Sequence, residues 1–203
     1  MGLYERHVLP RVIDVVLGKQ TDPVRARVAE RLSGEVLEVG FGSGRNVPHL
    51  PDAVTKLVAV DPATVGRELA AKRIEARGIP VEFIGLTGES LPLEDESVDH
   101  VLVTWTLCTI PDVDSALGEM HRVLRPGGAL HFVEHGRSPD QKAARRQEKV
   151  TPWWGKVAGG CRLDRHIPDL VERAGFVPDV RTYRDRGPEL FARMYEGRAY
   201  KPA

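Results

Sequence analysis

From Glu35 onward, short runs of β-branched and aliphatic residues alternate with longer stretches in which apolar residues recur at helical spacing. That alternation predicts a parallel sheet with helices on both faces, joined by right-handed crossovers. Glycine and proline end the predicted helices at Gly78 and at Arg125-Pro126-Gly127-Gly128. The predicted strands are Glu35–Gly40, Leu57–Asp61, Val81–Leu86, Val98–Thr104 and Ala129–Glu134, and the helices between them are Ala63–Arg77 and Val113–Leu124.

The two ends of the chain have a looser pattern. Before Gly18, apolar positions near helical spacing predict an amphipathic helix, and a second helix is expected from a cap at Asp22, with Pro23 in its first position, toward Leu32. Past Ser138 we expect a charged helix, an aromatic and glycine-rich stretch, a helix capped by Asp164, and two strands that close the sheet antiparallel. These features are Tyr4, Val8, Val12, Val15 and Val16 in the first helix, then Gln141–Lys149, Trp153–Cys161, Asp164–Ala174, Val177–Tyr183 and Glu189–Tyr195.

Length and composition fit one globular domain. The chain has 203 residues, of which 41% are hydrophobic and 29% charged, which is enough to bury a core and gives no sign of disorder or repeats. We expect a single domain over residues 1–203. Its parts are N-terminal helices (1–33), an α/β core that carries the candidate binding residues described below (34–136), an insertion (137–163), and a closing helix with antiparallel strands (164–203).

The charge balance and the cysteine content limit which binding partners and which cellular compartment we expect. Lys plus Arg equals Asp plus Glu, at 29 each, so nucleic acid is disfavoured, because it needs a basic face. Cys108 and Cys161 are too few for a disulfide framework and lack metal-ligand spacing, so we expect no metal and a cytoplasmic location. Charged residues and Pro10 interrupt the first apolar run, so we expect neither a signal peptide nor a membrane-spanning segment there.

A glycine-rich turn follows the first predicted strand. Its glycines are Gly40, Gly42 and Gly44, and such a turn lets the backbone approach a ligand closely at the carboxyl edge of the sheet. A dinucleotide fingerprint would need glycine where Arg45 stands, so the spacing favours a nucleoside over a pyrophosphate. A purely structural turn is the alternative.

Two acidic residues flank this turn. Asp61 ends the second strand, where a carboxylate can accept hydrogen bonds from both hydroxyls of a ribose. Glu38, inside the first strand, is placed to hold an ammonium group such as that of a methionine moiety, and a capping or ion-pair role is the alternative.

The runs Leu37–Gly44, Val60-Asp61-Pro62, Leu91-Pro92-Leu93 and Val123–Gly128 together resemble the small-molecule methyltransferases that include ubiquinone-biosynthesis enzymes. The resemblance implies a Rossmann-like α/β fold, with a seven-stranded, mostly parallel sheet of order 3-2-1-4-5-7-6 and helices on both faces. It also implies S-adenosyl-L-methionine as cofactor and S-adenosyl-L-homocysteine as product. The cofactor residues it implies are Glu38, Gly40, Phe41, Gly42, Gly44, Asn46, Asp61, Pro62, Gly88, Glu89, Thr104 and Trp105.

Two of these assignments leave alternatives open. Many relatives carry an Asp-Ala pair where this chain has Thr87 and Gly88, so the adenine amino group is expected to meet Glu89, Thr87 or backbone alone. Trp105 is expected to pack on the adenine or roof the acceptor site, with simple core packing as the competing interpretation.

The second half of the chain resembles the animal methyltransferase-like thiol methyltransferases. The resemblance lies in residues 103–110, in Glu134-His135 and in residues 160–165, which include Leu107-Cys108 and Gly160-Cys161. The animal enzymes begin with a hydrophobic membrane anchor, whereas this chain starts with the amphipathic pattern described above. The resemblance therefore does not imply membrane anchoring for this chain, and peripheral contact with a membrane is left as an alternative.

A thiol acceptor, whose pKa is about 8.5, must lose a proton before it attacks the methyl group. His135 follows the fifth strand at the expected site edge and suits a general base, with a structural role as the alternative. Asp164 is a second catalytic candidate. Trp153, Trp154 and Cys161 would form an apolar wall if the insertion covers the pocket, and would otherwise be core.

The sequence thus predicts methyl transfer from S-adenosylmethionine to a small, lipophilic thiol. Rival acceptors are a quinone ring carbon, a phenol or a phospholipid amine, because such relatives share the whole cofactor half. A nicotinamide-dependent oxidoreductase is disfavoured by Arg45. A protein that binds the cofactor without catalysis remains the rival from another functional class.

Overall fold

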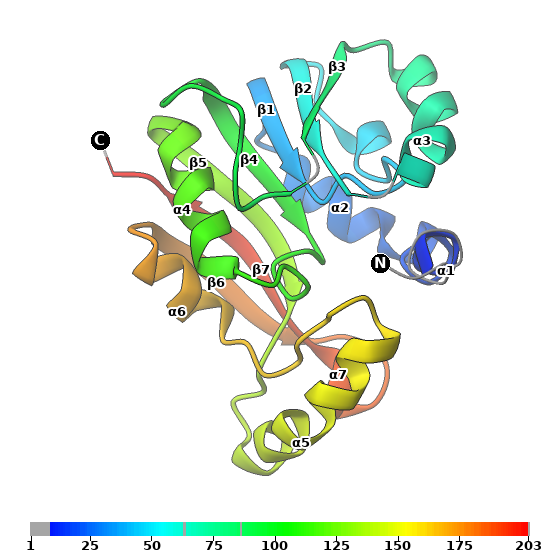
Figure 1. The fold of residues 1–203 in the computed structure, drawn as a ribbon, viewed down its shortest axis with the longest axis vertical. Helices are drawn as coiled ribbons and strands as arrows, with labels where there is room; N and C mark the ends of the chain where they lie inside the picture. Colours follow the sequence, from blue (N-terminus) through cyan, green and yellow to red (C-terminus); the bar gives the residue numbers. More distant parts are fainter. Residues whose placement is uncertain (1–8, 63, 86, 203) are drawn as a thin grey trace.

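The computed structural model describes residues 9–62, 64–85 and 87–202. Within these ranges a seven-stranded sheet runs in the order β3-β2-β1-β4-β5-β7-β6. The first five strands pair in parallel, and β7 lies antiparallel between β5 and β6 (Figure 1). The expected strand order is confirmed. The strands are β1 Gly34–Val39, β2 Val54–Val60, β3 Val81–Gly85, β4 Val98–Thr104, β5 Leu124–His135, β6 Val177–Arg184 and β7 Arg193–Tyr200.

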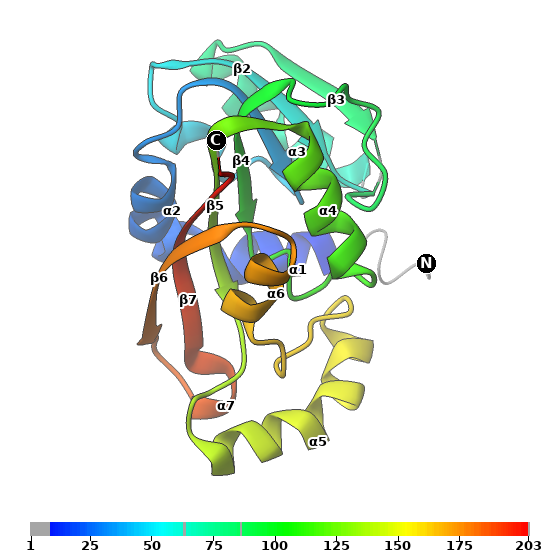
Figure 2. The ribbon, with the colours of Figure 1, turned by 90° about the vertical axis from the view of Figure 1, so that its left-hand side faces the viewer.

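Helices cover both faces of the sheet because alternate strand residues are apolar on each side. On one face, Leu37, Val103 and Phe132 pack with residues of α4 and α6, which lie together in Figure 2. On the other, Val36 and Leu102 pack with residues of α2, α3 and η3. The helices are α1 Leu9–Val16, η2 Lys19–Thr21, α2 Asp22–Ala29, η3 Val47–His49, α3 Thr64–Arg77, α4 Val113–Val123, α5 Gln141–Val157, α6 Ile167–Arg173 and α7 Glu189–Ala192.

Three predicted boundaries are wrong, each for a local reason. The turn Arg125-Pro126-Gly127-Gly128 lies inside β5, since Gly127 N–H donates to Lys201 O and Lys201 N–H donates to Gly128 O, which extends the pairing. The helix from Gln141 continues through Pro152 to Val157, because Trp154 and Val150 pack on a buried cluster beneath it. A short helix, α7, replaces the strand expected from Glu189, and Arg193 pairs with Glu189 one turn away.

Two predicted helix caps also differ. Asp164 does not cap α6, whose N-cap is His166, and its carboxylate instead accepts hydrogen bonds from Arg162. The N-cap of α2 is Thr21, so Asp22 is its first residue. The remaining predicted positions Tyr4, Val8, Ala63 and Leu86 lie outside the described residues.

None of the helices in the described ranges is long and apolar enough to cross a membrane. The expected single domain, with its four parts, stays a prediction.

Candidate active site

The glycine-rich turn leaves the carboxyl end of β1 beside the ends of β2 and β4. Gly40, Gly42 and Gly44 have φ angles of 80°, 55° and 70°, in the left-handed region that favours glycine. The N–H of Gly40 donates to Val60 O over 2.9 Å, which fixes the turn to β2. A Cβ atom at position 40 would overlap the side chain of Thr106, just past β4. The turn therefore needs glycine for its conformation and for its close contact with the loop after β4.

Asp61 follows β2 and lies against the same turn. Its Oδ2 accepts a hydrogen bond from the N–H of Gly42 over 2.7 Å, and the residue is 7% exposed. The carboxylate is thus fixed at the site edge, where the sequence places a ribose ligand. Pro62, the next residue, is exposed.

A buried polar network lies behind the turn. Asn46 Nδ2 donates to Glu38 Oε1 over 2.8 Å and to Thr104 Oγ1 over 3.0 Å. Arg25, from α2, donates to Asn46 Oδ1 over 2.7 Å and to Thr104 Oγ1 over 3.1 Å. The side chains of Asn46 and Thr104 therefore hold the Glu38 carboxylate and the Arg25 guanidinium in fixed orientations. Sequence reasoning missed Arg25, because nothing in the α2 pattern distinguishes it from a surface arginine.

Glu38 is the candidate ligand for an ammonium group, and one of its carboxylate oxygens is still free to accept a hydrogen bond. It is 1% exposed, and its Oε2 has no hydrogen-bond partner among the described residues. Burial raises the pKa of Glu38 to about 8, against the opposing effects of the Asn46 hydrogen bond and the Arg25 charge. An orphaned carboxylate oxygen beside a glycine turn is what a cationic ligand group would complete.

Helix α1 contacts the outer side of the turn through Asp14. Its carboxylate accepts from Ser43 Oγ and from Arg45, with Arg45 Nε 2.7 Å from Oδ1. Arg73 of α3 lies 3.5 Å from the same oxygen and donates to Ser43 O. The hydrogen bond from Arg45 does most to lower the pKa of Asp14. Arg45 thus anchors α1 on the turn, a role for which the sequence carried no signal.

The other residues predicted to bind the cofactor differ in how far they are buried and in what they contact. The Phe41 ring packs in the core, edge-to-face with Phe83 at 5.2 Å, so only its backbone lines the turn. Trp105 has a positive φ of 52°, and the Arg25 guanidinium lies 4.7 Å from its ring centroid. Gly88 is buried, and a Cβ there would lie 2.9 Å from Val39 Cγ1. Glu89 is half-buried.

Glu134 organises the loop after β4. Its carboxylate, 0% exposed at the end of β5, accepts from the backbone N–H groups of Thr106, Leu107 and Cys108 over 2.7, 2.9 and 3.2 Å. Burial raises the pKa of Glu134 to about 7, although these three hydrogen bonds act in the opposite direction. This residue fixes the position of Thr106 against Gly40.

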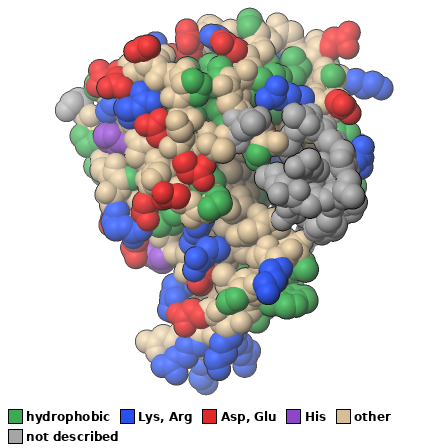
Figure 3. All heavy atoms as spheres, viewed as in Figure 1, with side chains coloured by type: hydrophobic (Ala, Val, Ile, Leu, Met, Phe, Trp, Pro, Cys, Tyr) green, Lys and Arg blue, Asp and Glu red, His purple; other side chains and the backbone are tan. Residues whose placement is uncertain are grey.

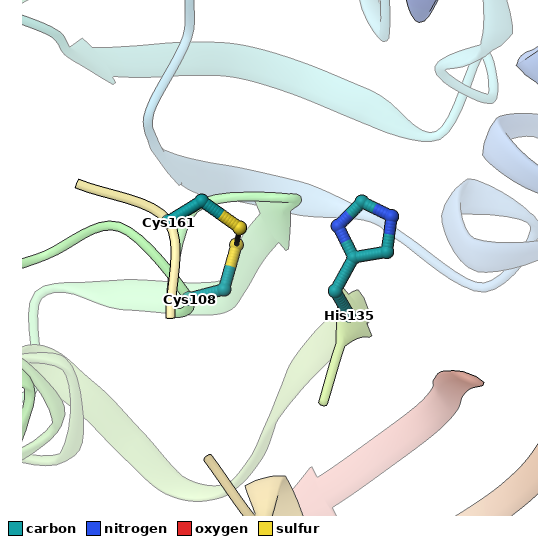
Figure 4. Close-up of side chains that lie close together, drawn as sticks. All are labelled: Cys108, His135 and Cys161. Carbon is teal, nitrogen blue, oxygen red and sulfur yellow. Dashed lines mark hydrogen bonds between the residues drawn. The ribbon is translucent and has the colours of Figure 1, made fainter. Parts of the chain in front are cut away.

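Cys108, His135 and Cys161 meet beside this loop (Figure 4). The two sulfurs are 3.7 Å apart, and one ligand atom from each of the three residues lies within 4.8 Å of the others. The pKa of Cys161 is lowered, first by the hydrogen bond with Cys108 and then by His135 and Trp154, while that of Cys108 is raised. The predicted base His135 is therefore next to both cysteines, whereas Asp164 is not part of this group.

Hydrogen bonds to backbone carbonyl groups hold the two cysteine-bearing loops together. The N–H of Arg162 donates to Cys108 O over 2.7 Å, and the Arg165 guanidinium donates to Leu107 O and, over 2.7 Å, to Ile110 O. Around the cysteines, Leu163 and the partly buried residues Val150, Trp154, Ala158, Leu190 and Phe191 form an apolar cluster. The insertion thus packs over the loop after β4.

A separate cavity of about 280 Å³ is lined by α2, β6 and β7. Its walls carry Arg27, Arg31 and Arg198 together with Glu30 and Glu196. None of the residues that are predicted to bind the cofactor lines it.

Comparison with known proteins identifies the class. Residues 37–132 match the family model described as a methyltransferase domain. The chain is 30% identical over 161 residues to a phosphatidylethanolamine N-methyltransferase of Cereibacter sphaeroides, covering 72% of this chain and 77% of that protein. A solved structure of a SAM-dependent methyltransferase, possible histamine N-methyltransferase, from Thermotoga maritima aligns with a TM-score of 0.69 and 26% identity, covering 98% of each chain. The chain belongs to the class I, S-adenosylmethionine-dependent methyltransferases.

One group of relatives is nearer in sequence. The chain is 35% identical over 145 residues to the thiol S-methyltransferase TMT1B of Rattus norvegicus, covering 70% of this chain and 59% of that protein. It thus spans about three fifths of the length of this relative. S-adenosylmethionine is the cofactor of this class, and the orphaned Glu38 oxygen, Asp61 and the glycine turn fit it.

Gly40→Ala is expected to weaken cofactor binding at least about tenfold, because a left-handed alanine costs about 1–2 kcal/mol and its Cβ would displace Thr106. Titration calorimetry and thermal unfolding would measure both effects. Gly118→Ala is the matched control, since a Cβ at this position in α4 meets nothing within 4 Å. It should keep cofactor affinity and gain up to about 1 kcal/mol of stability. Equal cofactor affinities for the two variants would contradict the role given to Gly40.

The affinity for S-adenosylmethionine is expected to rise from pH 6 to pH 8. Glu38, with its pKa raised to about 8, is protonated at the lower pH and must ionise to hold an ammonium, so each unit below 8 costs up to about tenfold in affinity. Calorimetry in buffers of different ionisation enthalpy should detect proton release on binding. The Glu38→Gln variant should bind S-adenosylmethionine weakly, with an affinity that does not change with pH. If the affinity of the parent protein did not change between pH 6 and pH 8, the assignment of Glu38 as the ammonium ligand would be wrong.

Asp61→Ala is expected to weaken cofactor binding by at least about tenfold, because ribose hydroxyls would lose their acceptor. Asp61→Asn keeps an oxygen for the Gly42 N–H but loses the charge. It should restore the melting temperature more than the cofactor affinity. If Asp61→Asn bound the cofactor as tightly as the parent, the carboxylate would only support the turn.

Proposed function

We propose that the protein transfers the methyl group of S-adenosylmethionine to a small, lipophilic thiol. The observation that carries this proposal is the meeting of Cys108, His135 and Cys161. Each belongs to one of the three segments in which the sequence resembles thiol methyltransferases, and these segments are far apart along the chain. Identity of 35% to a thiol S-methyltransferase points the same way.

The cofactor half of this function rests on the residues around the turn. Glu38 would hold the methionine ammonium, Asp61 the ribose hydroxyls, and the backbone of the glycine turn would lie against the nucleoside. When bound, S-adenosylmethionine supplies an electrophilic methyl group on a sulfonium. Arg25 and Trp105, with the guanidinium 4.7 Å from the ring centroid, would close the inner side of this site.

The acceptor half rests on the insertion. Trp154 packs on Phe191 with ring centroids 4.6 Å apart, next to the cysteines. An apolar lining of this kind favours a lipophilic molecule. His135 stands at the carboxyl end of β5, beside two sulfurs that share a hydrogen bond, and is placed to accept the proton of an incoming thiol. A catalytic role for Asp164, whose carboxylate accepts a hydrogen bond from Arg162, stays a prediction.

A phospholipid amine is a second candidate acceptor, and helix α5 favours it. This helix exposes Lys142, Arg145, Arg146 and Lys149, seen as the basic end of the molecule in Figure 3. Trp153, on the same helix, is 65% exposed. Basic and aromatic side chains together suit the surface of an anionic membrane. A solvated helix face accounts equally for the charges alone.

Incubation of the purified protein with S-adenosylmethionine and a panel of thiols, quinols, phenols, and free or phospholipid amines would test the acceptor class. Thiols alone are expected to give S-adenosylhomocysteine, with preference rising with apolar surface. Asp61→Ala serves as the control with impaired cofactor binding. Turnover confined to phospholipid amines would move the function to lipid methylation, and cofactor binding without turnover would favour a non-catalytic protein.

A further inference from the structure

Cys108, His135 and Cys161 have the geometry of an incomplete tetrahedral metal site. Two thiolates bound to one zinc ion at about 2.3 Å each would have sulfurs about 3.7–3.8 Å apart. The observed separation is 3.7 Å, and the imidazole offers a nitrogen within 4.8 Å of both sulfurs. Neither the spacing of the cysteines nor their apolar neighbours indicated a metal, because the ligands come from three separate segments.

The ligand-bearing loops are held in place by bonds that need no metal. Glu134 fixes the backbone of residues 106–108, and Arg162 N–H joins the second cysteine loop to Cys108 O. Cys108 is 1% exposed and Cys161 is 7% exposed, while His135 is half-buried. The three ligands are therefore preorganised before any metal binds, and the two cysteines are shielded from solvent.

A buried donor lies next to these ligands. The Trp154 indole Nε1 is buried and has no hydrogen-bond partner in the described part of the chain, and the Trp154 side chain packs against the cluster that contains Cys108 and Cys161. Sulfur ligands of metals are commonly supported by such N–H groups. The donor is thus available to a thiolate held at this place.

The ligand types select the ion. Thiolate and imidazole ligands favour zinc over magnesium or calcium, which prefer oxygen. Two cysteines and one histidine leave the fourth tetrahedral position open, as catalytic zinc sites do.

We propose that Cys108, His135 and Cys161 bind one zinc ion, and that the thiol acceptor occupies the open fourth position as a thiolate. The thiol-binding part rests on the proposed function. It gives His135 the role of metal ligand in place of general base. Zinc in this role lowers the pKa of the bound thiol, so that a nucleophile forms at neutral pH.

The proposed reaction balances without an oxidant or reductant. The acceptor R–SH loses its proton to water as its sulfur binds the zinc. That sulfur then forms a bond to the methyl carbon, while the bond from this carbon to the sulfonium breaks and leaves its electron pair on the homocysteine sulfur. The products are R–S–CH₃, S-adenosylhomocysteine and one proton, and the neutral thioether leaves the zinc for water to replace.

Metal content tests the site independently of activity. The full chain, produced with zinc in the medium, is expected to carry about one zinc per molecule. Cys108→Ser, Cys161→Ser and His135→Ala should lower the zinc content at least about fivefold. His166→Ala is the matched control, because this exposed histidine pairs with Asp169 and should leave the content unchanged. Circular dichroism would verify that each variant is folded.

Chelation and reconstitution of the parent protein test the role of the ion. Removal of zinc should lower turnover on thiols at least about tenfold with unchanged cofactor affinity, and added zinc should restore it. Cobalt added to the zinc-free protein should show the thiolate charge-transfer bands of a tetrahedral site. A parent protein that methylates thiols with no zinc, or whose mass shows a Cys108–Cys161 disulfide, would overturn the zinc site and leave the proposed function intact. Zinc binding without turnover on any thiol would instead overturn the thiol function and the acceptor's place on the metal.

Discussion

Both parts of the candidate site, the glycine turn and the cysteine cluster, depend on the hydrogen bonds that the carboxylate of Glu134 accepts. It lies at the end of β5, without exposure to solvent, and receives three consecutive backbone N–H groups from the loop after β4. Through Thr106 this loop touches the glycine turn at Gly40, and through Cys108 it reaches the insertion. One buried acid therefore relates the position of the glycine turn to the position of the insertion.

The site also separates its charges by burial. Glu38 and Glu134 are enclosed acids with raised pKa values, whereas Asp14 lies nearer the surface and has a lowered pKa because Arg45 binds it. Of the enclosed acids, Glu38 keeps one oxygen without a hydrogen-bond partner among the described residues, and Glu134 accepts from a row of backbone donors. The outer acid serves the contact between α1 and the turn. Equal numbers of acidic and basic residues in the sequence conceal this division.

The sheet could be predicted from the sequence because its signals are local. Apolar runs such as Val98–Thr104 coincide with the observed strand, and Gly40, Gly42 and Gly44 mark a turn whose conformation only glycine adopts readily. The predictions failed where distant residues decide the structure. Pro152 is tolerated within α5 because the helix packs on the cysteines, and Gly127 lies in β5 because the C-terminal residues pair with it. The grouping of Cys108 with His135 and Cys161, and the position of Arg25, depend likewise on tertiary contacts.

The ion pair between Asp14 and Arg45 makes the attachment of helix α1 sensitive to the surrounding solution. Helix α1 lies on the outer side of the glycine turn, and its ionic contact includes Arg73 of α3. Contacts between partly exposed charges weaken as dissolved ions screen them. The attachment of α1 to the glycine turn is thereby coupled to ionic strength, although the turn itself is held by backbone hydrogen bonds that dissolved ions do not screen.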